Sequence, residues 1–182
     1  AENHRSPIRT FLGSAAGGLD RVVMCNWTPN GRGDAVTRER GSGELVFCKP
    51  AEIPVSLGEL ASFVEDGEPH ARHGGVLYLS QQNDSLRQTF PMLVDDGLIP
   101  PSLPFGDEAF GKPCEACNLW VGDARAVSTV HRDSFENLYV CLVGEKVFDL
   151  LSPLAAPFMG EDEYPTATFR VVPVVAGEDG SA

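Results

Sequence analysis

The stretch that decides the fold is "TVHRDSFENLYVCLVGEKVF", residues 129–148. It predicts a strand, a tight turn at Gly144-Glu145 and a second strand. Because residues i and i+2 of a strand point to the same face, His131 and Asp133 are expected side by side at the head of an apolar segment. The apolar side chains that follow occupy both faces of the expected strand, which is typical of a strand buried in a core.

An imidazole beside a carboxylate can chelate one divalent metal ion. Mixed nitrogen and oxygen ligation with open positions suits ferrous iron in a 2-His-1-carboxylate arrangement. A solvent-exposed His–Asp pair is the plainer alternative for an isolated H-x-D tripeptide, but a strand buried on both faces seldom begins with a chelating pair by chance. Lys146 follows the turn, where its ammonium would return beside the metal and pair with a dicarboxylate ligand. An exposed hairpin lysine is the competing interpretation.

Composition limits the partners that this chain can have. At 182 residues, with 42% hydrophobic and 22% charged residues, it is expected to fold as a single globular domain. Its net charge of -12 repels nucleic acid and anionic membrane surfaces, and no apolar run approaches the ~20 residues of a membrane span, so neither partner is expected. Five cysteines, an odd number, favour a reducing compartment, the cytoplasm and also the nucleus.

The rest of the chain offers short strands separated by turn residues. Ser56 with Glu59 predicts a capping box for a helix that runs to Gly67, and a second helix over residues 85–97 is interrupted by Pro91. The proline-rich stretch 98–113 is expected to be a loop. Strands at short intervals are typical of a barrel or a double-sheet jelly roll. The expected strands are 22–25, 45–48 (closed by Pro50), 74–83, 116–123, 128–144 and 145–153.

The stretch "NLWVGDARAVSTVHRDSFENLYVCLVGEKVFDLLSP", residues 118–153, strongly resembles the JmjC/cupin-like Fe(II)- and 2-oxoglutarate-dependent oxygenases. "TPNGRGDAV", "GGVLYLSQQN" and "YPTATFRV" match in order, so that the resemblance runs from about Arg21 onward. Within the family the chain is similar to the jumonji-domain-containing protein seven subclass, described as lysyl hydroxylases. The resemblance implies a mainly β JmjC domain with flanking helices, a double-stranded β-helix. Residues 1–70 would form an N-terminal α/β flank and residues 71–182 the first part of the jelly-roll core.

The resemblance also implies roles for individual residues. His131 and Asp133 match the iron ligands, and Lys146 matches the lysine that holds the distal carboxylate of 2-oxoglutarate. Strand parity places Thr129, rather than Ser128, on the face of His131, a conflict that a bulge would resolve. Four further positions match residues that line or assist the cosubstrate pocket: Ser128, Tyr78, Asn137 and Tyr139.

One departure from the family pattern concerns the third iron ligand, a histidine on a later strand. The four histidines are His4, His70, His73 and His131, and none follows His131. We therefore expect a partial chain whose jelly roll is incomplete at the C-terminus, with a natural non-catalytic relative as the alternative. The H-x-x-H of residues 70–73 is expected to be a solvated loop.

The function expected from the resemblance is an Fe(II)- and 2-oxoglutarate-dependent protein hydroxylase, a lysyl hydroxylase, that consumes O2 and acts on a protein or peptide substrate. The acidic surface would suit a basic substrate. A catalytically inactive interaction module and a JmjC-type peptidase or demethylase are the alternatives, and a homodimer is left open. Cys114 and Cys117 form a C-x-x-C without a second pair for zinc, and we expect a loop of free thiols.

Overall fold

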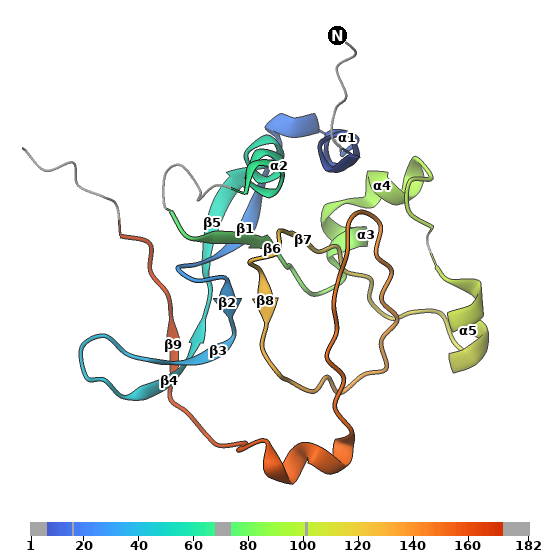
Figure 1. Ribbon diagram of the computed structural model, residues 1–182. Helices are drawn as coiled ribbons and strands as arrows, with labels where there is room; N and C mark the ends of the chain where they lie inside the picture. Colours follow the sequence, from blue (N-terminus) through green and yellow to red (C-terminus); the bar gives the residue numbers. More distant parts are fainter. Residues whose placement is uncertain (1–6, 16, 68–73, 101, 173–182) are drawn as a thin grey trace, which may run out of the picture.

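The computed structural model describes residues 7–15, 17–67, 74–100 and 102–172, and Figure 1 shows how its elements are arranged. The helices are α1 (Pro7–Gly13), η1 (Gly18–Asp20), α2 (Leu57–Asp66), α3 (Ser85–Thr89), α4 (Pro91–Asp95), α5 (Pro104–Phe110) and η2 (Pro153–Phe158). The strands are β1 (Val22–Thr28), β2 (Arg32–Gly33), β3 (Ala35–Arg38), β4 (Leu45–Lys49), β5 (Ala51–Ser56), β6 (Val76–Leu79), β7 (Val121–Gly122), β8 (Val127–Ser128) and β9 (Thr166–Thr168).

The main sheet has four strands in the order β5-β1-β6-β7, and all its neighbours are antiparallel. In β1 the buried side chains alternate, as expected for a strand with one face on the core: Val23, Cys25 and Trp27 are buried. They belong to one apolar cluster with residues of α1, α2, α3 and α4. The expected flank and the expected jelly-roll core thus both contribute strands to this sheet.

Helix α2 confirms the capping box. The Ser56 hydroxyl accepts a hydrogen bond from the Glu59 backbone, and the Glu59 carboxylate accepts one from the Ser56 backbone. Gly67 ends the helix in the left-handed conformation with φ of 67°, which glycine adopts without strain. The helix interrupted at Pro91 is also confirmed, as α3 followed by α4.

Two elements differ from the sequence prediction because proline was interpreted as a breaker. Strand β5 follows Pro50 directly and contains Pro54, which is tolerated because β5 lies at the edge of its sheet. Helix α5 occupies part of the stretch 98–113 that was expected to be a loop. Pro104 begins that helix, where a missing N–H costs nothing, and Gly111 ends it with φ of 66°.

Two smaller sheets flank the main one: the parallel pair β2-β8 and the three-stranded β3-β4-β9. Gly31 contacts the chain at the start of β8. Its carbonyl accepts a hydrogen bond from Val127, and a Cβ added to it would lie 1.9 Å from the Arg125 carbonyl oxygen. Its φ of +82° also favours glycine. This close approach positions Ser128 and the residues after it.

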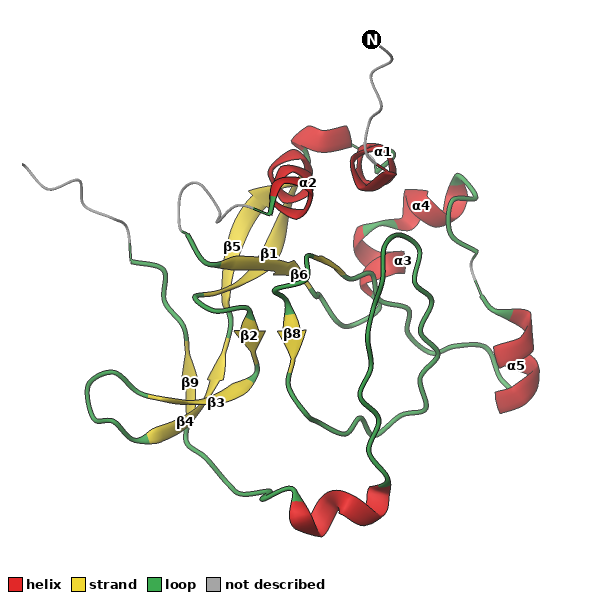
Figure 2. Ribbon diagram, in the orientation of Figure 1, coloured by secondary structure: helices red, strands yellow, loops and turns green. Residues whose placement is uncertain are grey.

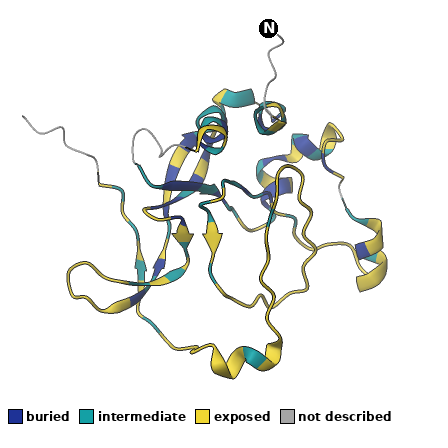
Figure 3. Cartoon of the chain, viewed as in Figure 1, coloured by how far each residue is buried: buried dark blue, intermediate teal, exposed yellow. Residues whose placement is uncertain are grey.

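The segment 129–152 is the main correction to the predicted fold. The strands expected at 128–144 and 145–153 are wrong beyond Ser128, since residues 129–152 form an irregular excursion with a bend at Val143-Gly144 (Figure 2). Its apolar side chains, expected to be buried on both faces, are mostly exposed (Figure 3). A strand needs a neighbouring backbone to complete its hydrogen bonds, and none of the described strands pairs with these residues.

None of the helices within the described ranges has both the length and the apolar character needed to cross a bilayer.

Candidate metal centre and cosubstrate pocket

His131 and Asp133 lie together although the segment that carries them is not a strand. The His131 Nε2 atom is 3.8 Å from Asp133 Oδ1, and both side chains are more than half exposed. The His131 Nδ1 atom lies 2.6 Å from the Thr129 carbonyl oxygen. Because a carbonyl only accepts hydrogen bonds, Nδ1 is the donor in this contact, and Nε2 is the ring nitrogen nearer the carboxylate.

Asn137 orients the carboxylate. Its Nδ2 donates to Asp133 Oδ2 at 2.9 Å, which leaves Oδ1 to face the imidazole. Both candidate ligands are therefore held from behind by a hydrogen bond, as outer-shell partners hold ligands in metal sites. Sequence reasoning had matched Asn137 to a cosubstrate-pocket position, whereas its contact is with the metal-ligand candidate.

The donor set fits a divalent metal ion in part. Two acceptor atoms, an imidazole nitrogen and a carboxylate oxygen, face each other across a gap that a cation would bridge, and solvent can reach them. Within the described ranges no group of three or more His, Cys, Asp or Glu side chains is placed to hold a metal ion. His4, His70 and His73 lie outside the described residues.

A row of aromatic rings lies on the other side of this region. The ring centroids of Tyr78 and Trp120 are 6.4 Å apart, those of Trp120 and Tyr139 are 6.3 Å apart, and those of Tyr139 and Phe148 are 4.9 Å apart. The indole Nε1 of Trp120 is buried and has no hydrogen-bond partner among the described residues. Sequence reasoning did not single out Trp120 or Phe148, because an apolar residue in an expected strand is normally a core residue.

Lys146 reaches this aromatic row. Its Nζ lies 5.8 Å from the centroid of the Tyr78 ring and 6.0 Å from that of Phe148, within the range of a cation–π interaction. Tyr78 comes from β6 and Lys146 from the irregular segment, so that two of the matched cosubstrate residues meet only through the tertiary structure.

Ser128 belongs to the same group. Burial and then the neighbouring Tyr139 raise the pKa of Tyr78 to about 12, while a hydrogen bond with the Ser128 side chain acts in the opposite direction. Thr129 faces elsewhere, since its hydroxyl donates to the Asp34 carbonyl at 2.7 Å. The structure thus forms two groups, His131–Asp133–Asn137 and Tyr78–Ser128–Tyr139–Lys146, connected through the short stretch 137–139.

Known proteins show the same domain. A family described as "Cupin-like domain" matches residues 10–179. The chain is 39% identical over 145 residues to the bifunctional peptidase and (3S)-lysyl hydroxylase JMJD7 of Homo sapiens, which covers 79% of this chain and 42% of that protein. It is 33% identical over 153 residues to JmjC domain-containing protein E of Dictyostelium discoideum, covering 82% of this chain and 43% of the relative.

A third relative is the lysine-specific demethylase JMJ32 of Arabidopsis thaliana, 35% identical over 150 residues that cover 82% of this chain and 41% of that protein. The chain therefore spans about two fifths of the length of the curated relatives that it matches. The family match covers the sheets, the flanking helices and both groups of site residues described above. This chain belongs to the cupin-like family, as a sheet-dominated JmjC domain with flanking helices.

Proposed function

We propose that this domain serves an Fe(II)- and 2-oxoglutarate-dependent hydroxylase that acts on lysyl side chains of a protein substrate. The observation that carries the proposal is the approach of His131 Nε2 to Asp133 Oδ1 at 3.8 Å, with each side chain held by a further hydrogen bond. Iron held there, with 2-oxoglutarate and O2, would supply the oxidising power to hydroxylate a carbon–hydrogen bond.

The residues around the pair keep it ready to ligate. The Thr129 carbonyl selects the imidazole tautomer whose Nε2 is free, and Asn137 keeps one carboxylate oxygen turned toward the imidazole. Such fixed orientation reduces the reorganisation that metal binding would otherwise require. The structure supplies two ligand candidates in this way. The other coordination positions would be filled by 2-oxoglutarate, O2 and a third protein ligand.

Lys146 is proposed to hold the distal carboxylate of 2-oxoglutarate. Its ammonium lies against the Tyr78 ring, whose hydroxyl is protonated at neutral pH and can donate a hydrogen bond. Ser128 is the second hydroxyl in this group. The rings of Trp120, Tyr139 and Phe148 extend the aromatic surface beside the ammonium.

The substrate class rests on the relatives and on charge. The names of two relatives specify lysine, one as a (3S)-lysyl hydroxylase and one as a lysine-specific demethylase. The net charge of -12 on this chain would attract a basic segment around such a lysine. We propose hydroxylation rather than demethylation because the hydroxylase is the more similar of the two relatives.

Metal binding tests the first part. Mn(II), as a redox-inert substitute for Fe(II), is titrated into the full chain and into His131→Ala, Asp133→Ala and Asn137→Ala variants, with Asp149→Ala as an exposed control. We expect each ligand variant to lose at least about tenfold in affinity and Asn137→Ala about tenfold, because an outer-shell partner acts through its ligand. In a longer protein that joins this domain to a later histidine, His131→Ala should abolish iron-dependent decarboxylation of 2-oxoglutarate. Unchanged Mn(II) affinity in both ligand variants would overturn the assignment.

The cosubstrate pocket is tested separately through Lys146. Lys146 is half-buried, and loss of a hydrogen bond to a charged group costs about 1.5–3 kcal/mol, so Lys146→Ala should lower the affinity for 2-oxoglutarate by about tenfold to a hundredfold. Lys146→Arg should restore only part of that affinity, because guanidinium is longer and planar. Lys49→Ala, an exposed lysine on β4, is the matched control. An affinity that does not change in Lys146→Ala would remove this role while leaving the metal site untouched.

A further inference from the structure

A second chemically distinctive group lies outside the proposed pocket. Cys114 and Cys117 are separated by two residues, with a bend of the chain at Glu115 between them. Both are free thiols; Cys114 is exposed and Cys117 is half-buried. A C-x-x-C pair with one accessible and one sheltered thiol is the arrangement in which one cysteine is attacked or attacks first and the other resolves the product.

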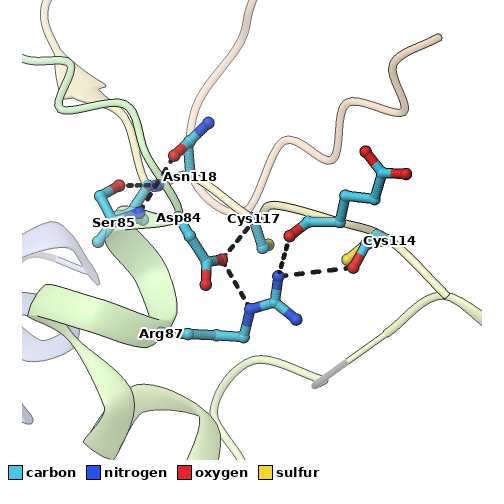
Figure 4. Close-up of polar contacts among 8 residues, drawn as sticks. Asp84, Ser85, Arg87, Cys114, Cys117 and Asn118 are labelled. Carbon is cyan, nitrogen blue, oxygen red and sulfur yellow. Dashed lines mark hydrogen bonds and ion pairs between the residues drawn. The ribbon is translucent and has the colours of Figure 1, made fainter. Parts of the chain in front are cut away.

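The loop that carries the two cysteines is clamped onto the start of α3 (Figure 4). Asp84 Oδ1 accepts hydrogen bonds from the Cys117 backbone at 2.8 Å and from Arg87 Nε at 2.6 Å. The Cys117 carbonyl accepts one from the Leu86 backbone at 2.9 Å. Both the N–H and the carbonyl of Cys117 are therefore hydrogen-bonded, which fixes the backbone that carries its thiol.

Arg87 brings a positive charge to the bend that carries the two thiols. Its guanidinium reaches across the bend and donates to the Glu115 carbonyl at 2.8 Å, with the Cys114 carbonyl 3.5 Å away (Figure 4). A cation beside a thiol stabilises the thiolate, which is the reactive form. Burial and the neighbouring Cys114 raise the pKa of Cys117, and Arg87 opposes that rise. The pKa of Arg87 is raised chiefly by its hydrogen bond to Asp84, and the two cysteines make smaller contributions in the same direction.

We propose that Cys114 and Cys117 form a reversible dithiol–disulfide site that exchanges with small disulfides such as glutathione disulfide. The Cys114 thiolate attacks one sulfur of the small disulfide, whose S–S bond breaks to release one thiolate. The Cys117 thiolate then attacks Cys114 Sγ, forms the internal disulfide and releases the second thiolate. Two protein thiols are oxidised, one small disulfide is reduced to two thiols, and these carry away the two protons.

The assignment of roles follows from access. Cys114 is exposed and meets the small disulfide first. Cys117 is half-buried, and burial followed by the neighbouring Cys114 disfavours its thiolate until Cys114 is modified. A structural zinc site does not compete with this chemistry inside the described ranges, because no group of three metal-ligating side chains forms there.

The test uses the full reduced chain in glutathione buffers of graded oxidation, quenched with acid, alkylated and mapped by peptide mass spectrometry. We expect an internal Cys114–Cys117 bond, seen as the loss of two hydrogens in a monomer. Cys117→Ser should accumulate glutathione on Cys114, whereas Cys114→Ser should leave Cys117 largely unmodified. Cys141→Ser, which removes another exposed thiol, is the control and should still form the bond. Random mixed disulfides at Cys114 and Cys141 without the internal bond would overturn the proposal.

Arg87 provides a second measurement. A cation at this bend favours the attacking thiolate, so Arg87→Gln should slow the first step, measured as the rate of glutathione addition. Arg87→Lys keeps the charge and should keep most of the rate. Equal rates for all three proteins would show that Arg87 does not activate the pair. No metal or 2-oxoglutarate enters this assay, so its outcome is independent of the proposed hydroxylase activity.

Discussion

Two apolar regions of this molecule differ in burial. In the main sheet and its helices, Leu60 of α2 and Leu77 of β6 are fully buried, whereas Leu150 and Phe158 in the stretch 129–158 are 88% and 87% exposed (Figure 3). The two regions have similar apolar character in the sequence. What differs is the neighbour: strands β5, β1, β6 and β7 complete one another's hydrogen bonds and present one face to the helices, while residues 129–152 have no such partner among the described strands.

The candidate site lies across the junction of these regions. Tyr78 comes from the packed sheet, while Lys146 and the His131–Asp133 pair come from the exposed stretch. A pocket built in this way depends on how firmly the second region is held against the first. Variants that act on one region and spare the other therefore separate the two contributions.

The largest expected difference comes from a matched pair of leucines. Leu60→Ala removes a fully buried side chain and leaves a cavity, so that the free energy of unfolding should fall by about 3 kcal/mol, within a range of about 2–5 kcal/mol. Leu150→Ala removes a side chain that already lies in water and should change it by less than about 0.5 kcal/mol. Denaturant unfolding followed by circular dichroism measures both; a cost above about 1 kcal/mol for Leu150→Ala would show that the stretch 129–158 is buried in solution.

Gly31 tests the connection between the regions. Alanine at this position would carry a Cβ 1.9 Å from the Arg125 carbonyl oxygen, at a φ of +82° that itself costs about 1–2 kcal/mol. We expect Gly31→Ala to lower the free energy of unfolding by about 2 kcal/mol or more and to displace β8 with Ser128. Gly43→Ala also has a positive φ but meets no atom within 4 Å, so it reports the backbone strain alone. Equal losses for the two variants would mean that the approach of Gly31 to Arg125 is unimportant.

Tyr78 tests the contact between the sheet and the site through alkaline pH. Its pKa of about 12 in the folded chain lies above its ordinary value of 10, so the folded state holds the phenolic proton more tightly than the unfolded state. The resulting stability is present in full below pH 10 and is lost as the pH rises through about 12. A shift of two pKa units corresponds to about 2.7 kcal/mol. Because Tyr78 is partly exposed, we expect a smaller contribution to stability, about 1–2 kcal/mol.

The free energy of unfolding, measured between pH 9 and pH 12, should therefore fall less steeply with pH in Tyr78→Phe than in the parent chain. Burial also raises the pKa of Cys25 to about 12, and this thiol acts in the same direction in both proteins, so that the difference between them reports Tyr78. Parallel pH profiles would contradict the burial of the Tyr78 hydroxyl.

The smallest effects concern two serine caps, one in each region. Ser56→Ala removes the cap of α2, and we expect a loss of about 1 kcal/mol in the free energy of unfolding. Ser152 accepts a hydrogen bond from the Leu154 backbone at the start of η2 in the exposed stretch. Ser152→Ala should leave the midpoint of global unfolding nearly unchanged, because local opening there does not need the core to unfold. Similar losses in both variants would show that the two regions unfold as one unit.

Local rules predicted those parts of the chain in which neighbours in sequence are also partners in space. The capping box of Ser56 and Glu59 and the end of the helix at Gly67 need only one helix, and both were predicted correctly. Strand β5 and helix α5 were missed because their prolines were interpreted without knowledge of position: an edge strand and a helix N-terminus accept proline, but only the assembled fold shows where the edge and the terminus are.

The sequence by itself determined the family resemblance. It also predicted His131 and Asp133 side by side, from a strand that the structure does not contain, and their loop still places Nε2 3.8 Å from Oδ1. Only the tertiary structure decided that Lys146 lies against Tyr78, that Trp120 belongs to the same aromatic row, and that the apolar stretch 129–158 stays exposed. The physical reason is that the chemistry of a side chain is set by its own residue, whereas burial and strand pairing each require two surfaces in contact. A sequence pattern describes one of these surfaces but does not identify its partner.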